Sequence, residues 1–433
     1  MAVLRIGVDD TDSKDGMCTT YVGAMIVDRL IKHGIKLADF PHLIRLNPNV
    51  PWKTRGNCAI CIVVQVKEEQ IATAKKIALK TVEELAELHV ESTNPGVVFY
   101  QGEKVPAELK EFSKRVVQDI ATIDEAESLA EKIDAEAYKF KLGRGIIGAL
   151  AAIGNTLDED WTFELIAYRA RENWGKPRKI DEASVRLMND ITYPNTFDNL
   201  DPTTGEIRIT PHTPCPVLYG IRGESPEVVE EAHKLIRAFE PIDRWIVYKT
   251  NQGTDEHLRP ARIREIKPFW SVIVDGVVCE KPRIIVGGHV IFKIQNGTGE
   301  IDCAAYEPTR HFREVVKELH VGDKVRVYGG VKEKPGLPTT INLEKISILE
   351  LVPIFRKVNP PCPKCGKRMK SEGRDKGYSC KRCKIKAPAN AAKLEEVKRE
   401  IDLGTFEVPV RCRRHLAKPL VREIHVKFPK REF

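Results

Sequence analysis

Four cysteines in the last fifth of the 433-residue chain form two C-x2-C pairs, Cys362 with Cys365 and Cys380 with Cys383, with fourteen residues between the pairs. Four thiolates at this spacing can close a tetrahedral shell around Zn²⁺ and leave no coordination position open. We therefore predict a zinc ribbon over residues 359–388, with a structural rather than a catalytic metal. The alternative is four unrelated thiols. The other seven of the eleven cysteines show no regular spacing.

The region around these cysteines is strongly basic. Residues 353–433 contain 23 Lys and Arg against 9 Asp and Glu, whereas residues 1–352 contain 47 against 53. A basic block on a mildly acidic body is typical of nucleic-acid binding, because neutralising phosphates releases condensed counterions. A merely solvated basic surface has the same composition. Beyond the ribbon we expect a charged helix over 390–402 and a basic tail, so that 389–433 form a last segment.

Residues 1–141 alternate apolar strand patterns with helical patterns, which predicts an α/β domain. Strands are expected at 3–8 and 59–66, and helices at 19–33 and 70–88.

Residues 142–255 show the order strand, helix, hairpin, strand, helix, strand. This is the βαββαβ order of a ferredoxin-like fold. The hairpin is expected at 196–210, and Ser225 followed by Pro226 is typical of the start of a helix.

Residues 268–352 contain short strands at close intervals, with a helical stretch, 308–319, between the third and the fourth. Five strands with this helix and Gly turns match an OB-fold barrel, which commonly binds nucleic acids. Together with the other segments, this predicts a multidomain α+β protein. Four aromatic residues are candidates for stacking on bases, unless they fill the barrel core: Trp270, Phe292, Tyr306 and Tyr328.

Three carboxylates follow the first predicted strand and precede the first predicted helix: Asp9, Asp10 and Asp12. Carboxylates this close repel one another unless a cation or backbone donors compensate. Oxygen ligands suit Mg²⁺, and the N-terminus of the following helix would present unpaired N–H groups to phosphate oxygens. We therefore predict a catalytic magnesium site at this turn. The alternative is a polar turn that caps the helix.

A bound nucleotide would need donors other than a Walker-type loop, because no G-x-x-x-x-G-K-[ST] occurs in the chain. One Pro-bounded loop combines cations with a Gly that permits close backbone approach, although a solvated turn would look similar. Its candidate ATP-binding residues are Arg45, Lys53, Thr54, Arg55, Gly56 and Asn57.

A second glycine-rich stretch begins with Gly143, Arg144 and Gly145 and formally matches G-x-G-x-x-G. The βαβ context of a dinucleotide site is missing, which disfavours an NAD-dependent oxidoreductase. We interpret these residues as a backbone loop near the nucleotide, with plain helix packing as the alternative.

No apolar stretch approaches the length of a membrane span, and the N-terminus becomes acidic before a signal peptide could develop. We expect a cytoplasmic protein with no membrane association and no obligate protein partner.

The chain resembles the archaeal family of 2-agmatinylcytidine (agmatidine) synthetases in four motifs: GVDDTDS at 7–13, GMCTTY at 16–21, LIRLNPNVPWKTRGN at 43–57 and GRGIIGALAAIG at 143–154. The order of the later domains is also similar. The resemblance implies an ATP-dependent ligase with a kinase-like N-terminal domain. This ligase activates C2 of the wobble cytidine in the CAU anticodon of isoleucine tRNA and attaches agmatine there, which changes decoding from AUG to AUA. It also implies that ATP is split to AMP and pyrophosphate and that Thr19 is tied to the phosphoryl group of ATP.

The guanidinium of agmatine requires a carboxylate partner. Candidates for agmatine binding in the second domain are Tyr193, Asn195 and Asp198, with Glu164 on a neighbouring strand. The alternative for Asp198 is that it only shapes the hairpin. The alternative for the whole protein is a non-catalytic nucleic-acid-binding protein built on the OB-fold and the zinc ribbon.

Overall fold

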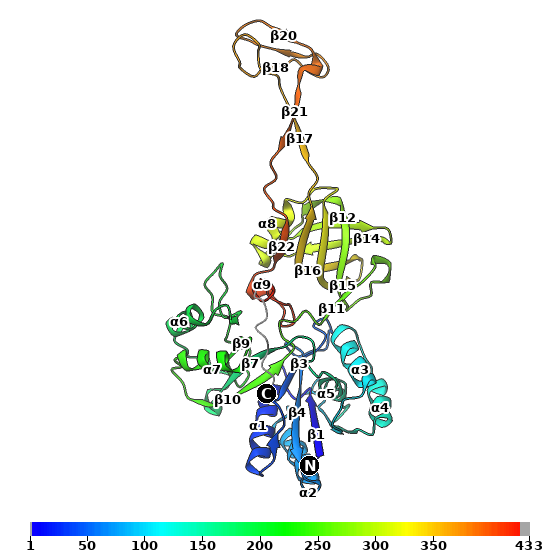
Figure 1. Ribbon diagram of the computed structural model, residues 1–433, viewed down its shortest axis with the longest axis vertical. Coiled ribbons are helices and arrows are strands. Elements are labelled where there is room, and N and C mark those ends of the chain that lie inside the picture. Colours follow the sequence, from blue (N-terminus) through cyan, green and yellow to red (C-terminus); the bar gives the residue numbers. More distant parts are fainter. Residues whose placement is uncertain (1, 425–433) are drawn as a thin grey trace.

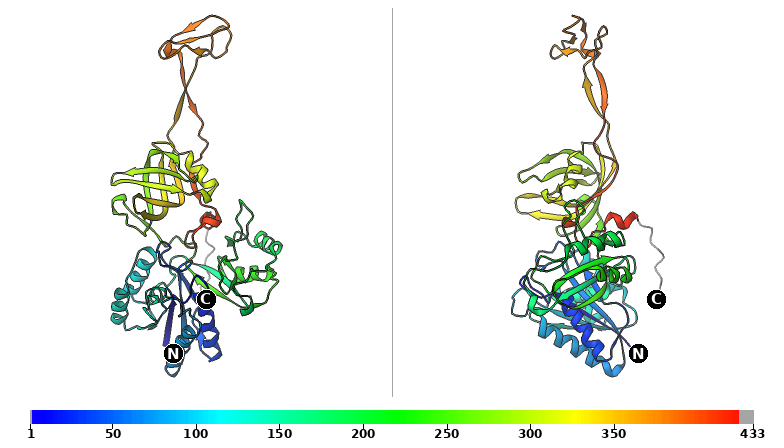
Figure 2. Two further views of the ribbon diagram at one scale, coloured as in Figure 1. Left: turned by 180° about the vertical axis from the view of Figure 1, so that it is seen from behind. Right: turned by 90° about the vertical axis from the view of Figure 1, so that its left-hand side faces the viewer.

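The computed structural model describes residues 2–424 of the chain. Figure 1 shows three tiers: a body that contains both N-terminal units, a barrel above the body, and a small ribbon held away from the barrel on a two-stranded stalk. The two views in Figure 2 show the same arrangement, with the barrel between the body and the stalk.

The first unit confirms the predicted alternation of strands and helices. Its sheet runs in the order β5-β1-β4-β3, and each neighbouring pair is antiparallel. Two short strands, β2 (Lys36–Leu37) and β6 (Glu136–Lys139), pair with β4 and β5. The main elements are β1 (Ala2–Asp9), α1 (Thr19–Lys32), β3 (His42–Arg45), β4 (Cys58–Val66), α2 (Glu68–Leu85) and β5 (Gly96–Gln101).

The second unit confirms the predicted ferredoxin-like order, since its sheet runs β10-β7-β9-β8. Numbered within each unit, both sheets have the strand order 4-1-3-2, so the body contains the same topology twice. A parallel pairing of β3 with β10 joins the two into one sheet. The elements of the second unit are β7 (Thr162–Arg169), α6 (Glu182–Thr192), β8 (Thr196–Phe197), β9 (Val217–Gly223), α7 (Pro226–Leu235) and β10 (Ile242–Thr250).

The hairpin predicted over 196–210 is wrong. β8 pairs with β9 instead, and a single bridge between Leu200 and Ile207 connects the two segments that were expected to pair. The turn at Asp201 is present, because the Asp201 carbonyl accepts a hydrogen bond from the Gly205 N–H at 2.7 Å. The chain after this turn runs along the cavity described below.

Helices cover both faces of the first unit's sheet. α1 and α2 pack on one face, while α3 (Ala107–Gln118), α4 (Ile123–Lys132) and α5 (Gly145–Gly154) pack on the other. α5 lies so close to β1 that a Cβ atom on Gly7 would be 2.2 Å from the carbonyl oxygen of Ala149. Glycine therefore permits this packing, which brings α5 beside Asp9 at the end of β1.

The barrel confirms the predicted OB-fold. β12 pairs with both β13 and β15, so the sheet closes on itself. Trp270 and Phe292 are buried in its core, which favours the core alternative for these two residues, whereas Tyr306 and Tyr328 are half-buried. The elements are β12 (Ser271–Ile284), β13 (Val290–Asn296), β14 (Gly299–Ala305), α8 (His311–Lys317), β15 (Lys324–Lys334) and β16 (Leu337–Glu350).

The helix predicted over 390–402 is wrong. β21 (Lys393–Val397) pairs antiparallel with β17 (Ile354–Val358) and builds the stalk (Figure 1). A strand pair satisfies the backbone groups of both segments that cross between barrel and ribbon, which a helix from one segment would not do. The ribbon consists of β18 (Lys370–Ser371), β19 (Tyr378–Ser379) and β20 (Lys386–Ala387).

The segment predicted as a basic tail returns to the barrel and the body. β22 (Gly404–Glu407) adds to β16 of the barrel, and α9 (Leu420–Ile424) lies beyond it. Arg422 then contacts Glu224 of the second unit at 2.5 Å. Residues 425–433 of the predicted tail lie outside the described residues. Within the described part of the chain, no helix combines the length and apolar character that a bilayer crossing requires.

Candidate active site

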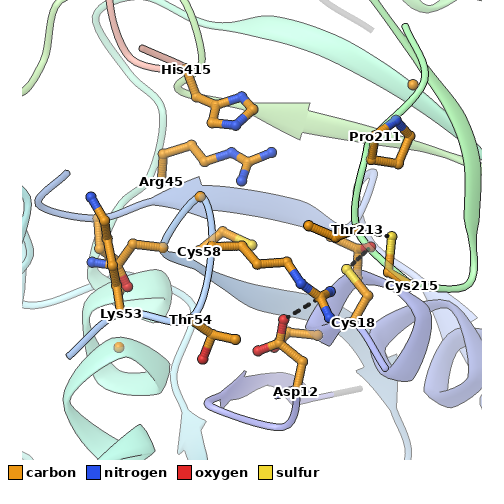
Figure 3. A pocket seen from close by; sticks show the side chains of 18 of the residues that line it. Asp12, Cys18, Arg45, Lys53, Thr54, Cys58, Pro211, Thr213, Cys215 and His415 are labelled. Carbon is orange, nitrogen blue, oxygen red and sulfur yellow. Dashed lines mark hydrogen bonds and ion pairs between the residues drawn. The ribbon is translucent and has the colours of Figure 1, made fainter. Parts of the chain in front are cut away.

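A cavity of about 430 Å³ lies where the two units of the body meet the returning C-terminal segment. In Figure 3, Asp12 lies below the cavity, Lys53 and Thr54 lie on the left, and Arg45 and His415 lie above it. The predicted site residues that line the cavity are Asp9, Asp10, Asp12, Thr19, Arg45, Lys53, Thr54, Arg55, Gly56, Asn57, Arg144, Glu164 and Asp198.

Four predicted residues do not line this cavity. Gly143 has a positive φ of 66° and precedes α5, and a Cβ atom on Gly145 would be 2.5 Å from the Asp9 carbonyl oxygen. For these two residues the structure favours the helix-packing alternative. Tyr193 and Asn195 are exposed on the segment after α6.

The acidic turn connects the end of β1 to the start of α1. Its Asp10 has a left-handed backbone with φ of 59°, and the Thr11 hydroxyl donates to Oγ1 of Thr19 at 3.1 Å. Cys18, the residue that precedes α1, makes no side-chain cap, and the first turn of α1 contains no acidic residue. The uncompensated N–H groups of α1 beside this turn therefore suit an anion.

Burial shapes the electrostatics of the acidic turn. It raises the pKa of Asp9 well above the ordinary value, and the neighbouring Asp10 adds to the effect. Burial also raises the pKa of Asp10, against the opposing effect of Arg144, and raises that of Asp12 to about 6, against Arg55. Gly148 leaves room for this arrangement, since a Cβ atom there would be 1.9 Å from Oδ2 of Asp9.

Two arginines compensate part of this negative charge. Arg144 lies 2.9 Å from Oδ2 of Asp10, and Arg55 lies 3.3 Å from Oδ2 of Asp12. Desolvation makes the charged form of these carboxylates unfavourable, and a divalent cation at the turn would stabilise that charged form.

A second pair of carboxylates, Glu164 and Asp198, lies in the part of the cavity contributed by the second unit. Glu164 accepts a hydrogen bond from Gln252 Nε2 at 2.5 Å and lies 3.6 Å from Arg45 Nη2. Arg222 bridges the two carboxylates, with contacts of 3.5 Å to Glu164 and 3.4 Å to Asp198. Both are therefore negative groups held in place by surrounding cations and amides.

The C-terminal segment contributes residues that the sequence patterns did not identify. Arg413 donates to Oδ1 of Asp198, and His415 lines the cavity near Arg45. The Nδ1 atom of His415 accepts a hydrogen bond from Arg222 Nη2 at 2.6 Å. Burial and the surrounding cations, Arg45 first among them, lower the pKa of His415 well below its usual value. His415 is therefore neutral at physiological pH and carries its proton on Nε2.

The ribbon contains a metal site of the predicted kind. Its four cysteines are the one group among the described residues whose ligand atoms converge within 4.8 Å of one another. Four sulfur ligands in this arrangement fit a structural Zn²⁺. The carboxylates of the acidic turn do not converge in this way.

A cavity shared by two ferredoxin-like units, on one chain with an OB-fold and a zinc ribbon, defines an enzyme that acts on a nucleic acid. Family models match this chain segment by segment. They are described as the TiaS TCKD domain at 5–142, the TiaS FLD domain at 143–257, an OB-fold nucleic acid binding domain at 272–349 and the TiaS C-terminal zinc ribbon domain at 359–401. The chain belongs to the TiaS family.

Similar proteins share nearly the whole length of the chain. The 2-agmatinylcytidine synthetase TiaS of Methanocaldococcus jannaschii, an enzyme of isoleucine tRNA, is 46% identical over 425 residues, which cover 97% of this chain and 99% of that protein. The same enzyme of Pyrococcus horikoshii is 47% identical over 421 residues, or 97% of each chain. A solved complex of TiaS with its isoleucine tRNA, AMPCPP and agmatine is 40% identical, with a TM-score of 0.85 and coverage of 100% of this chain and 99% of that one.

Proposed function

We infer that this chain is an ATP-dependent enzyme that attaches agmatine to C2 of the wobble cytidine of the isoleucine tRNA with a CAU anticodon. The observation that carries this inference is one cavity that holds both an acidic turn beside the start of α1 and a separate carboxylate pair, Glu164 and Asp198. The first part suits a nucleotide with its metal, and the second suits the guanidinium of agmatine. A protein that only bound nucleic acid would not need these two groups of desolvated carboxylates in one cavity, so the non-catalytic alternative is not favoured.

The chemistry requires activation of a poor leaving group. We propose that the C2 oxygen attacks a phosphorus atom of ATP, so that a C2–O–P ester forms while a P–O–P bond breaks. The agmatine amine then attacks C2, the oxygen departs with the phosphorus, and the nitrogen releases its proton to solvent. We propose further that ATP is consumed as AMP and pyrophosphate, which makes the enzyme a ligase.

Asp9, Asp10 and Asp12 are the residues proposed to hold Mg²⁺. When bound, the ion would neutralise charge on the phosphate oxygens. Arg144 and Arg55 already lie against two of these carboxylates, and we propose that both guanidinium groups also face the phosphates when the nucleotide is present.

We propose that the triphosphate lies between the start of α1, with Thr19, and the loop from Arg45 to Asn57. Lys53 in this loop has a pKa lowered to about 8, by burial first and then by Arg414. A half-buried ammonium among other cations gains most from an anionic ligand. The donors proposed for the phosphates are Arg45, Lys53, Thr54, Arg55, Gly56, Asn57 and Arg144.

We propose that Glu164 and Asp198 bind agmatine, and we leave Tyr193 and Asn195 out of the site because they do not line the cavity. We also propose a cytoplasmic location and the domain boundaries 1–141, 142–255, 268–352 and 359–388, followed by a segment that returns to the body.

The test is incorporation of radiolabelled agmatine into this isoleucine tRNA in the presence of ATP and Mg²⁺, with mass analysis of the wobble nucleoside. A methionine tRNA with the same anticodon bases is the matched control. The proposal expects label in the isoleucine tRNA alone, together with AMP and pyrophosphate. Binding of the tRNA without incorporation would contradict it.

A further inference from the structure

Arg413 holds the carboxylate that we assign to agmatine. It follows β22 on the segment that returns from the barrel, and its side chain is only 7% exposed. One guanidinium nitrogen, Nη1, donates to Oδ1 of Asp198, and the other, Nη2, lies 2.5 Å from Oε1 of Glu407. Arg413 therefore bridges two carboxylates from different parts of the fold.

The second oxygen of Asp198 also has a cationic partner, since Arg222 Nη1 lies 3.4 Å from Oδ2. Both oxygens of Asp198 thus face guanidinium groups of the protein itself. An incoming guanidinium that pairs with Asp198 competes with them, because guanidinium–carboxylate pairs are frequently bidentate and then use both oxygens. Glu164 and His415 hold Arg222 inside the cavity, whereas the other partner of Arg413, Glu407, does not line the cavity, so Arg413 is the guanidinium that can withdraw from Asp198.

We propose that Arg413 is a built-in competitor of agmatine that occupies Asp198 until agmatine replaces it, and that Arg413 thereby sets the affinity for agmatine. This rests on the proposed function, which places the agmatine guanidinium at Asp198.

Glu407 remains a charged partner of Arg413 after Arg413 releases Asp198. Glu407 lies on β22 opposite Lys345 of the barrel, and its Oε2 accepts a hydrogen bond from the Leu420 N–H at 3.1 Å. Because these contacts anchor Glu407 independently of Asp198, Arg413 retains one charged partner in either state. The exchange therefore replaces one guanidinium on Asp198 by another without leaving a buried charge unpaired.

The test is the KM for agmatine in the complete reaction, together with direct binding of radiolabelled agmatine to the full-length protein. Arg413→Gln should lower both the KM and the Kd, by about 10-fold if Arg413 occupies Asp198 about nine-tenths of the time. The KM for ATP should not change. Glu407→Gln should act in the opposite direction, because Arg413 then depends on Asp198 alone, and the double variant should behave like Arg413→Gln.

Arg237→Gln is the matched control, since it removes an arginine that pairs with Asp181 of the same unit away from the cavity. It should leave the agmatine KM unchanged. An unchanged or raised agmatine KM in Arg413→Gln would overturn the inference and make Arg413 a support for Asp198.

Asp198→Asn separates the two proposals. If Asp198→Asn raises the agmatine KM while Arg413→Gln fails to lower it, only the competitor role is wrong. If Asp198→Asn leaves the agmatine KM unchanged, agmatine binds elsewhere and both proposals are wrong. Thermal unfolding of each variant distinguishes a changed site from a misfolded chain.

Discussion

The guanidinium of Arg55 lies 3.3 Å from Oδ2 of Asp12 and also donates hydrogen bonds to the carbonyls of Ser13, Gly16 and Met17 at 2.6 to 2.8 Å. One side chain from the loop before β4 therefore ties that loop to the backbone of the acidic turn. A change of charge at Asp12 therefore affects both the loop before β4 and the acidic turn, which form two walls of the nucleotide part of the cavity.

Asp12→Asn should abolish ATP consumption while leaving tRNA binding nearly unchanged. It should also stabilise the fold, because burial raises the pKa of Asp12 to about 6, above the ordinary 3.8. Between pH 3.8 and about 6 the folded state binds more protons than the unfolded state, so the free energy of unfolding falls as the pH rises. Above pH 6 the full loss of stability persists. Asparagine removes a penalty of roughly 3 kcal/mol at pH 7, a figure that already includes the pairing with Arg55 because Arg55 contributes to the pKa of Asp12.

Thermal unfolding at pH 7 and ATP turnover measure both effects. Asp15→Asn is the matched control, since Asp15 lies in the same turn with an exposed side chain. It should change neither quantity. An Asp12→Asn protein that loses tRNA binding together with ATP turnover would indicate misfolding.

The pH dependence of kcat/KM for ATP should show an acidic limb. Asp12 has to be ionised to hold a cation, so activity should fall as pH drops through about 6. Because a bound divalent cation favours the ionised form, raising Mg²⁺ should move the limb to lower pH. A profile that is flat between pH 5 and 7 and insensitive to Mg²⁺ would contradict the assigned metal role.

His415 should act as a neutral hydrogen-bond donor rather than as a base. Its Nδ1 already accepts from Arg222, so Nε2 carries the proton. His415→Leu should lower kcat/KM for agmatine by about 100-fold or more, and His415→Gln, which restores a donor, should recover part of the loss. A role as a base would instead make both variants equally inactive.

Cys365→Ser should release zinc and weaken tRNA binding, by roughly 10-fold or more, because folding of a small ribbon depends on its metal. ATP-site properties should not change, since the ribbon lies at the far end of the stalk from the body (Figure 2). Metal analysis and filter binding measure these effects, with Cys279→Ser of the barrel as the matched control. Full tRNA affinity in a zinc-free protein would show that the ribbon does not contact RNA.

Local patterns were sufficient to predict much of the fold. Apolar periodicity located β1, α1, β4 and α2, and cysteine spacing located the ribbon. The doubling of the ferredoxin-like topology was not predictable, because it depends on which strands pair across the sheet, as β3 does with β10. The helix predicted over 390–402 was wrong for the same reason. Its charged residues are compatible with a helix, but the segment forms a strand because it pairs with β17.

The candidate site was predictable where its residues form a compact motif, as Asp9 to Asp12 and Lys53 to Asn57 do. Arg413 and His415 belong to the same cavity yet follow Asp12 by about four hundred residues. The one local signal was the dense run from Arg411 to His415, a cluster of arginines with a histidine, which the overall basic charge of the segment concealed. Tyr193 and Asn195 were grouped with Asp198 on sequence proximity alone, but they are exposed and do not line the cavity.

In the proposed reaction, the C2 oxygen of the wobble cytidine becomes a leaving group by bonding to phosphorus in this cavity. The most direct measurement uses the isoleucine tRNA with ¹⁸O at C2 of its wobble cytidine, with mass analysis of the products after a single turnover with ATP and agmatine. We expect ¹⁸O to leave attached to phosphorus, in AMP if the α-phosphorus is attacked or in pyrophosphate if the β-phosphorus is attacked. Recovery of the label in water, or its retention in the modified nucleoside, would rule out activation through phosphorus.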